Sequence, residues 1–180
     1  MHSPHFQSAP LPGASFAASP DRALALLTER GVLIVDDDRS NLEAVASVCT
    51  EYLSIPKHRV ALLHVRQGVS LTHIREEAEG ILRQTISSTG ACFGSLITDY
   101  NLSPSITSLE VWRSMDATFT DAPYLEPWRR TARVLMTAAT DEAPIHRAKT
   151  DRLIDTYIHK PFKITQLENA LITSILGRIG

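Results

Sequence analysis

The sequence predicts an α/β fold: a doubly wound, five-stranded parallel sheet with helices on both faces. Two observations support this. Short apolar runs alternate with longer segments whose apolar residues recur at helical spacing. The first of these runs, Val32–Val35, is wholly apolar, which is typical of a parallel strand buried on both faces. The 180 residues, of which 43% are hydrophobic, suffice for one domain with one core.

The first 30 residues predict an N-terminal tail. Residues 1–20 are rich in proline, serine, alanine and glycine, a composition that buries little apolar surface and predicts a flexible segment. Asp21–Glu29 predicts a short helix with Asp21 as its N-cap, and Gly31 ends it. We therefore expect residues 1–30 to form a flexible tail with a short helix and residues 31–180 to form the domain.

The domain begins with the fully apolar segment Val32–Val35, which predicts its first strand. The other four strands are expected at His58–Val65, Phe93–Thr98, Arg133–Met136 and Ile154–His159. Helices between and after them are expected at Ser40–Leu53, Ser70–Ser87, Ile106–Phe119, Asp141–Arg152 and Ile164–Ile175. The proline-containing segment Asp121–Arg130 is expected to be a loop. Strands and helices that alternate in this way predict right-handed crossovers and a covered sheet.

Polar side chains follow four of the five predicted strands. Asp36-Asp37-Asp38 follows the first strand, Asp99 the third, Thr137 the fourth and Lys160-Pro161 the fifth. In a parallel sheet the carboxyl ends of the strands meet at one edge, where ligands bind. We therefore expect these side chains to converge.

The predicted cluster suggests a cation site and phosphoryl chemistry. Neighbouring carboxylates repel one another unless a cation neutralises them, and oxygen ligands without histidine or cysteine suit Mg²⁺. A lysine and a hydroxyl opposite would complete a pocket for a dianionic group. Asp99 could then act as a nucleophile, because carboxylates form aspartyl-phosphates.

Four segments resemble the receiver domains of two-component response regulators, including the single-domain chemotaxis type. They are Val32-Leu33-Ile34-Val35-Asp36-Asp37-Asp38, Leu96-Ile97-Thr98-Asp99-Tyr100-Asn101-Leu102, Val134-Leu135-Met136-Thr137-Ala138 and Tyr157-Ile158-His159-Lys160-Pro161-Phe162. The resemblance covers roughly residues 31–180 and implies a flavodoxin-like receiver fold. The sequence departs from the usual family pattern in two respects. Ser103 stands where the family usually has proline, and the spacings from Asp37 to Asp99 and from Asp99 to Thr137 are longer than usual for the family.

The resemblance implies a role for each matching residue. Asp99 would be phosphorylated, and Mg²⁺ would be bound by Asp37, Asp99 and the main-chain carbonyl of Asn101, with Asp36 acting mainly through water. The phosphoryl group would be held by Thr137, Lys160 and the amide of Ala138. Tyr157 would follow Thr137 inward and change the face formed by the fourth helix, fifth strand and last helix.

The resemblance also implies partners and a location. We expect a cytoplasmic phosphoprotein in a phosphorelay, phosphorylated by a sensor histidine kinase or a phosphotransfer protein. It would signal by contacts with a downstream protein, either as a monomer or as a homodimer. It would be no enzyme beyond its own phosphorylation and dephosphorylation. Because Gly180 directly follows the last predicted helix, no output domain is expected. The formal charge of −2 indicates neither a nucleic-acid nor a membrane partner, and no apolar run is long enough to span a bilayer.

Several residues have simpler explanations. Asp38 is expected to be a solvated acid at a helix start. Cys49 and Cys92 are expected to be free thiols, His64 and His159 ordinary strand residues, and Trp128-Arg129-Arg130 a packing or surface segment. Tyr157 is as consistent with simple packing as with a switch.

Two other functions remain open. Asp36-x-Asp38-x-Ser40 after an apolar strand resembles the nucleophile motif of haloacid-dehalogenase-type phosphatases, although Glu168 is the sole acid after Lys160. A degenerate receiver that acts as a phosphorylation-independent binding module is the other alternative.

Overall fold

Five parallel strands form the centre of the molecule, as the sequence predicts. The computed structural model describes residues 19–119 and 122–179, so most of the predicted tail lies outside the described residues. The strands pair in the order β2-β1-β3-β6-β7. Their bounds are β1 Val32–Asp36, β2 Val60–His64, β3 Ser95–Asp99, β6 Ala132–Thr137 and β7 Thr156–His159. The doubly wound parallel sheet is thus confirmed.

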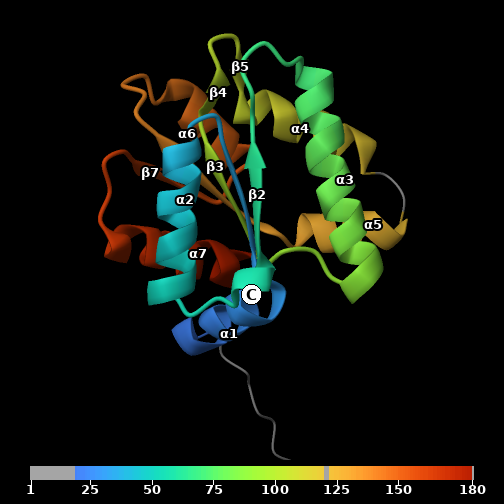
Figure 1. Cartoon of the computed structure of the whole chain (residues 1–180), viewed down its shortest axis with the longest axis vertical. Coiled ribbons are helices and arrows are strands. Elements are labelled where there is room, and N and C mark those ends of the chain that lie inside the picture. Colours follow the sequence, from blue (N-terminus) through green and yellow to red (C-terminus); the bar gives the residue numbers. More distant parts are fainter. Residues whose placement is uncertain (1–18, 120–121, 180) are drawn as a thin grey trace, which may run out of the picture.

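Helices cover both faces of this sheet (Figure 1). One face packs against α3 (Leu71–Thr89), α4 (Ser108–Thr118), α5 (Ala122–Arg129) and α6 (Ala143–Thr150). The other packs against α1 (Pro20–Arg30), α2 (Arg39–Ser47) and α7 (Ile164–Ile179). Within β1 the faces separate residue by residue, because Leu33 and Val35 belong to the first core and Val32 and Ile34 to the second.

The helix in the predicted tail packs into this second core. Ala23 and Leu27 are fully buried. The expected N-cap, Asp21, is wrong: the hydroxyl of Ser19 accepts the hydrogen bond from the amide of Arg22, and Pro20 occupies the first helical turn. Proline fits there because it lacks the amide that a first turn leaves unpaired. Gly31 ends the helix as predicted.

The segment expected as a loop at Asp121–Arg130 contains a helix, α5, which includes Pro127. The prolines suggested a loop, but tertiary contacts stabilise the helix. The indole of Trp128 is buried, stacks on Phe119 with ring centroids 5.1 Å apart, and donates a hydrogen bond of 2.6 Å to Asp116.

Two further differences concern local structure. The antiparallel pair β4 (Asn101–Ser103) and β5 (Ile106–Thr107) was not predicted, and α4 starts at Ser108 with a capping box of Thr107 and Glu110. The helix expected up to Leu53 ends as a π-helical turn, Val48–Tyr52, and a 3₁₀ turn, Lys57–Arg59, precedes β2.

None of the helices in the described ranges combines the length and apolar character of a membrane span.

Candidate functional site

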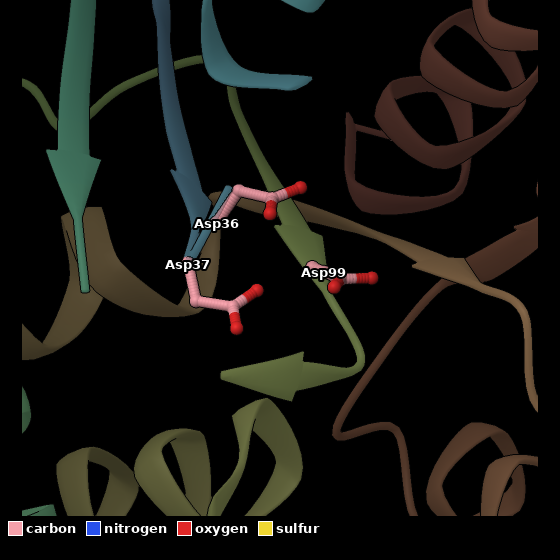
Figure 2. A group of neighbouring side chains, drawn as sticks. All are labelled: Asp36, Asp37 and Asp99. Carbon is pink, nitrogen blue, oxygen red and sulfur yellow. The ribbon is translucent and has the colours of Figure 1, made fainter. Parts of the chain in front are cut away.

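The predicted site residues gather at the carboxyl edge of the sheet. Asp36 ends β1 and Asp99 ends β3, and Figure 2 shows their side chains beside that of Asp37. Thr137 ends β6, and Lys160 directly follows β7. Parallel pairing of β1 with β3, β3 with β6, and β6 with β7 places these ends side by side.

Three carboxylates share one small space. One oxygen from each of Asp36, Asp37 and Asp99 lies within 4.8 Å of the others. Asp36 is fully buried, and its Oδ1 accepts a 2.8 Å hydrogen bond from the amide of Asp38. Because no histidine or cysteine in the described part of the chain joins the cluster, its donors suit a hard cation.

Lys160 is the cation of the cluster. Its Nζ lies 2.9 Å from Oδ1 of Asp99 and 3.2 Å from Oδ2 of Asp36. The same oxygen of Asp99 also accepts a 2.9 Å hydrogen bond from the amide of Tyr100. The peptide bond between Lys160 and Pro161 is cis. One ammonium thus neutralises part of the charge of three carboxylates.

The pKa values of these groups follow from burial and charge. Burial raises the pKa of Asp37, and the charge of Asp36 raises it further. Burial also raises the pKa of Asp99, although its hydrogen bond to Lys160 opposes the shift. Burial alone would lower the pKa of Lys160, but the hydrogen bond and charge of Asp99, together with Asp36, raise it overall. Lys160 therefore stays protonated at neutral pH.

The donor set fits Mg²⁺. Three clustered carboxylates with one lysine leave excess negative charge, and burial, with the charge of Asp36, raises the pKa values of Asp37 and Asp99. A divalent cation would neutralise this excess. Asn101, whose carbonyl is expected to join the ligands, lies two residues after Asp99 at the start of β4.

Thr137 is fully buried, and its Oγ1 accepts a 2.9 Å hydrogen bond from the amide of Ala139. Its main-chain carbonyl accepts a 2.7 Å hydrogen bond from the amide of Lys160. Ala138, the residue between, is exposed. The end of β6 is thus joined directly to the segment that carries Lys160.

Tyr157 lies away from the carboxylates. Its hydroxyl donates a 3.0 Å hydrogen bond to Oε2 of Glu142, and its ring contacts His146 and His159 edge to face. Nε2 of His146 lies 3.0 Å, and that of His159 2.9 Å, from the carboxylate of Glu142. The hydrogen bond of Tyr157 lowers the pKa of Glu142, and Glu142 raises that of Tyr157.

Sequence reasoning missed this group of Glu142, His146 and His159. The spacing of four residues between Glu142 and His146 indicates a helical pair, but no local signal connects them to β7. Asp38 lies where it was expected: it is exposed and caps α2 by accepting a hydrogen bond from the amide of Ser40. Within the segment Trp128-Arg129-Arg130, the indole is buried and the two arginines are exposed.

No protein-family model and no curated protein matches the sequence. Solved structures do match in fold. The signal receiver domain of an HD domain-containing protein from Pseudomonas fluorescens Pf-5 is 16% identical with a TM-score of 0.54, and the match covers 82% of this chain and 94% of that one. A two component response regulator from Cytophaga hutchinsonii is 21% identical with a TM-score of 0.55, covering 81% and 96%.

A third match, titled as an adenylate cyclase from Rhodopirellula baltica, is 17% identical with a TM-score of 0.56 and covers 80% of this chain and 85% of that chain. The chain therefore has the fold of response-regulator receiver domains. Because proteins of one fold can differ in function, function has to be argued from the site.

Proposed function

We propose that this chain is a phosphoacceptor receiver that is phosphorylated on Asp99 by a histidine kinase or a phosphotransfer protein. One observation carries the proposal: Asp99 is in contact with Lys160 and shares a space with the carboxylates of Asp36 and Asp37 at the carboxyl edge of a receiver-type sheet. A nucleophile, a fixed cation and a cation-binding pair are the parts that phosphoryl transfer to a carboxylate requires.

In the reaction, an oxygen of Asp99 bonds to phosphorus while the donor leaves with the electron pair of the bond that breaks. The ammonium of Lys160, already 2.9 Å from Asp99, neutralises charge that develops on the phosphoryl oxygens. Mg²⁺ held by Asp36, Asp37, Asp99 and the carbonyl of Asn101 would supply further positive charge. The chain would thus catalyse the phosphorylation of its own Asp99 and the hydrolysis of the resulting aspartyl-phosphate. It would turn over no separate substrate.

The switch would begin at Thr137. Its hydroxyl, together with the amide of Ala138, would bind the phosphoryl oxygens and give up the hydrogen bond from Ala139. Tyr157 would then leave Glu142 and move toward the space that Thr137 vacates. This movement changes the face formed by α6, β7 and α7, which we propose contacts a downstream protein or a second copy of this chain in the cytoplasm.

Acetyl phosphate with Mg²⁺, followed by intact mass measurement, tests the phosphorylation. We expect one phosphoryl adduct on the wild type and none on Asp99→Ala. Asp38→Asn is the matched control, because Asp38 is a neighbouring acid outside the carboxylate cluster, and this variant should still be labelled.

Two results would overturn the proposal. Absence of an adduct on the wild type, under conditions that label a control receiver, would favour the phosphorylation-independent binding module. Multiple turnovers of an aryl phosphate that Asp36→Asn abolishes would favour the phosphatase. The structure supports the phosphatase less, because Asp36 is fully buried and bonded to Lys160 while Asp38 caps a helix.

A further inference from the structure

A second polar cavity lies at the amino end of the sheet, opposite the carboxylate cluster. Its volume is about 260 Å³, and it lies between the ends of α5 and α7, which occupy the lower part of Figure 1. Six of its lining residues matter here: Asp116, Trp128, Arg129, Arg133, Arg152 and Arg178. We call it the arginine cavity.

Arg133 forms the floor of the arginine cavity. It is 4% exposed, and its guanidinium lies 4.2 Å from the centroid of the Trp128 ring. Its Nη atoms donate to both carboxylate oxygens of Asp116 and to the carbonyl of Leu153. Its Nε is buried and has no hydrogen-bond partner among the residues that the structure describes. A buried donor without a hydrogen-bond partner is costly, so the chain compensates the polar groups of Arg133 incompletely.

Arg178 closes one side of the cavity and is held rigidly. Its Nε donates to Asp155 at 2.7 Å, and its Nη atoms donate to the carbonyls of Arg129 and Arg152 at 2.8 and 3.3 Å. These bonds leave two of the five N–H groups of Arg178 unassigned. They also tie α7 to the two segments that carry the remaining arginines of the cavity.

Positive charge exceeds negative charge around the cavity. Asp116 accepts hydrogen bonds from the side chains of Arg133 and Trp128. Asp155 accepts hydrogen bonds from the side chain of Arg178 and from the amide of Arg133. Among the described residues, the side chain of Arg129 forms a salt bridge with Glu126 alone, at 3.8 Å, and that exposed carboxylate also lies 3.9 Å from Arg130.

Arg152 adds a further positive charge to this excess. Its side chain makes no hydrogen bond or ion pair with any residue in the described ranges, and it lies at the rim of the cavity. Four guanidinium groups therefore line a cavity whose neighbouring aspartates are already engaged.

We propose that the arginine cavity binds a small phosphate-bearing anion. Guanidinium groups recognise phosphate by paired, charge-assisted hydrogen bonds. Here they approach from β6, α5, α7 and the segment before β7, and a tetrahedral phosphate offers oxygens in several directions where a planar carboxylate does not. A dianion balances the charge excess, and the volume admits phosphate, pyrophosphate or part of a nucleotide. Binding would compensate the charge of the guanidinium groups and link α5 to α7.

Titration with pyrophosphate, inorganic phosphate, adenosine monophosphate and succinate tests this proposal on the whole chain. The buffer contains EDTA, so that no metal recruits phosphate to the carboxylate cluster, and sodium chloride keeps the ionic strength constant. Calorimetry measures affinity. The two indole ¹⁵N–¹H signals in NMR spectra report where the ligand binds. The chain has two tryptophans, and the Trp128 indole is hydrogen-bonded to Asp116, which lines the cavity.

We expect saturable binding of the phosphate compounds, with a shift of the Trp128 signal larger than that of Trp112. Arg129→Gln and Arg152→Gln should each weaken binding by about tenfold, as loss of a charge-assisted contact implies. Arg152→Lys should retain only part of the affinity that Arg152→Gln loses. Arg66→Gln is the matched control, since Arg66 is exposed beyond the carboxyl end of β2. Tighter binding of adenosine monophosphate than of pyrophosphate would identify a nucleotide as the source of the phosphate.

Three outcomes would overturn the proposal. They are no saturable binding of any phosphate compound, equal weakening by Arg66→Gln, and succinate binding as tight as pyrophosphate. All three are independent of whether Asp99 is phosphorylated.

Discussion

At Asp37, folding buries a carboxyl group and also brings it close to the negative charge of Asp36. The pKa of this carboxyl is raised in the folded chain, so the folded state binds its proton more tightly than the unfolded state does. The stability that this proton provides is lost as pH rises through the raised pKa, and at neutral pH Asp37 is a net cost without a metal. Two unit charges about 4 Å apart repel by ~1 kcal/mol in water and more inside a protein.

We therefore predict that Asp37→Asn melts a few degrees higher than the wild type at pH 7.5 in EDTA, given roughly 2–4 °C per kcal/mol in a domain of this size. The advantage should shrink on acidification toward pH 4. Thermal melts followed by circular dichroism across this range measure it. Glu51→Gln, an exposed acid outside the cluster, is the control; an advantage that is independent of pH would contradict the charge explanation.

Lys160 stabilises the folded chain, whereas Asp37 destabilises it at neutral pH, because Lys160 neutralises the fully buried Asp36 as well as Asp99. Removing one partner of a buried ion pair leaves an uncompensated charge and costs about 3–5 kcal/mol. We predict a loss of this order for Lys160→Met in EDTA, measured by urea denaturation. The double variant Lys160→Met, Asp36→Asn should recover part of it, whereas a double variant less stable than Lys160→Met would show that the pair does not act as described.

Among the elements, the turn from α1 into β1 depends on one glycine. Gly31 has φ of +78°, and a Cβ there would collide with the main-chain carbonyl of Arg59. Gly80, within α3, has open space around its Cα. We predict that Gly31→Ala loses more than about 2 kcal/mol, while Gly80→Ala gains about 0.8–1 kcal/mol through helix propensity. Denaturant melts compare the two, and equal effects would refute the steric argument.

The burial of α1 has a consequence for stability. Leu27 is fully buried against the second core and Leu24 is half-buried on the same helix. We predict that Leu27→Ala costs about 2–5 kcal/mol and Leu24→Ala clearly less. If both variants melt like the wild type, α1 contributes little to the stability of the domain.

How well each element could be predicted depends on where its stabilising contacts lie. The first strand could be predicted because Val32–Val35 is apolar throughout, a pattern that burial on both faces requires. The other four strands of the parallel sheet could be predicted because short runs rich in apolar residues lie between the helical segments. The helix α5 could not be predicted, because its stability depends on Trp128 and Asp116 meeting across the fold, which overrides the local effect of Pro127. Ser19 is the N-cap in place of Asp21 because Pro20 starts the helix one residue earlier.

For the molecule as a whole, one topological rule places the carboxylates, Thr137 and Lys160 at the same edge of the sheet from the sequence alone. No such rule joins Glu142 to His159, or Arg133 to Arg178, since these contacts depend on how helices seat on the sheet. The sequence therefore predicts the carboxylate cluster well and the group around Tyr157 and the arginine cavity not at all.

Magnesium should stabilise the entire fold, because its ligands come together only in the folded chain. At a concentration 100 times its dissociation constant, the gain is about 2.7 kcal/mol, or roughly 5–10 °C in melting temperature. We predict this rise for the wild type and its loss in Asp37→Asn, with calorimetric melts in matched sodium chloride as the control. A similar rise in the variant would exclude Asp37 as a ligand.

The ion pair between Lys160 and Asp36 joins residues 124 positions apart, near the two ends of the domain. A chain emerging from the ribosome therefore possesses the acids of its first strand long before the lysine that neutralises them. If Asp99 accepts a phosphoryl group as proposed, we expect it to react only after β7 docks at the sheet edge and brings Lys160 to it, so partly folded or truncated chains should not be phosphorylated. Under this proposal, the docking step that neutralises Asp36 is also the step that makes Asp99 reactive.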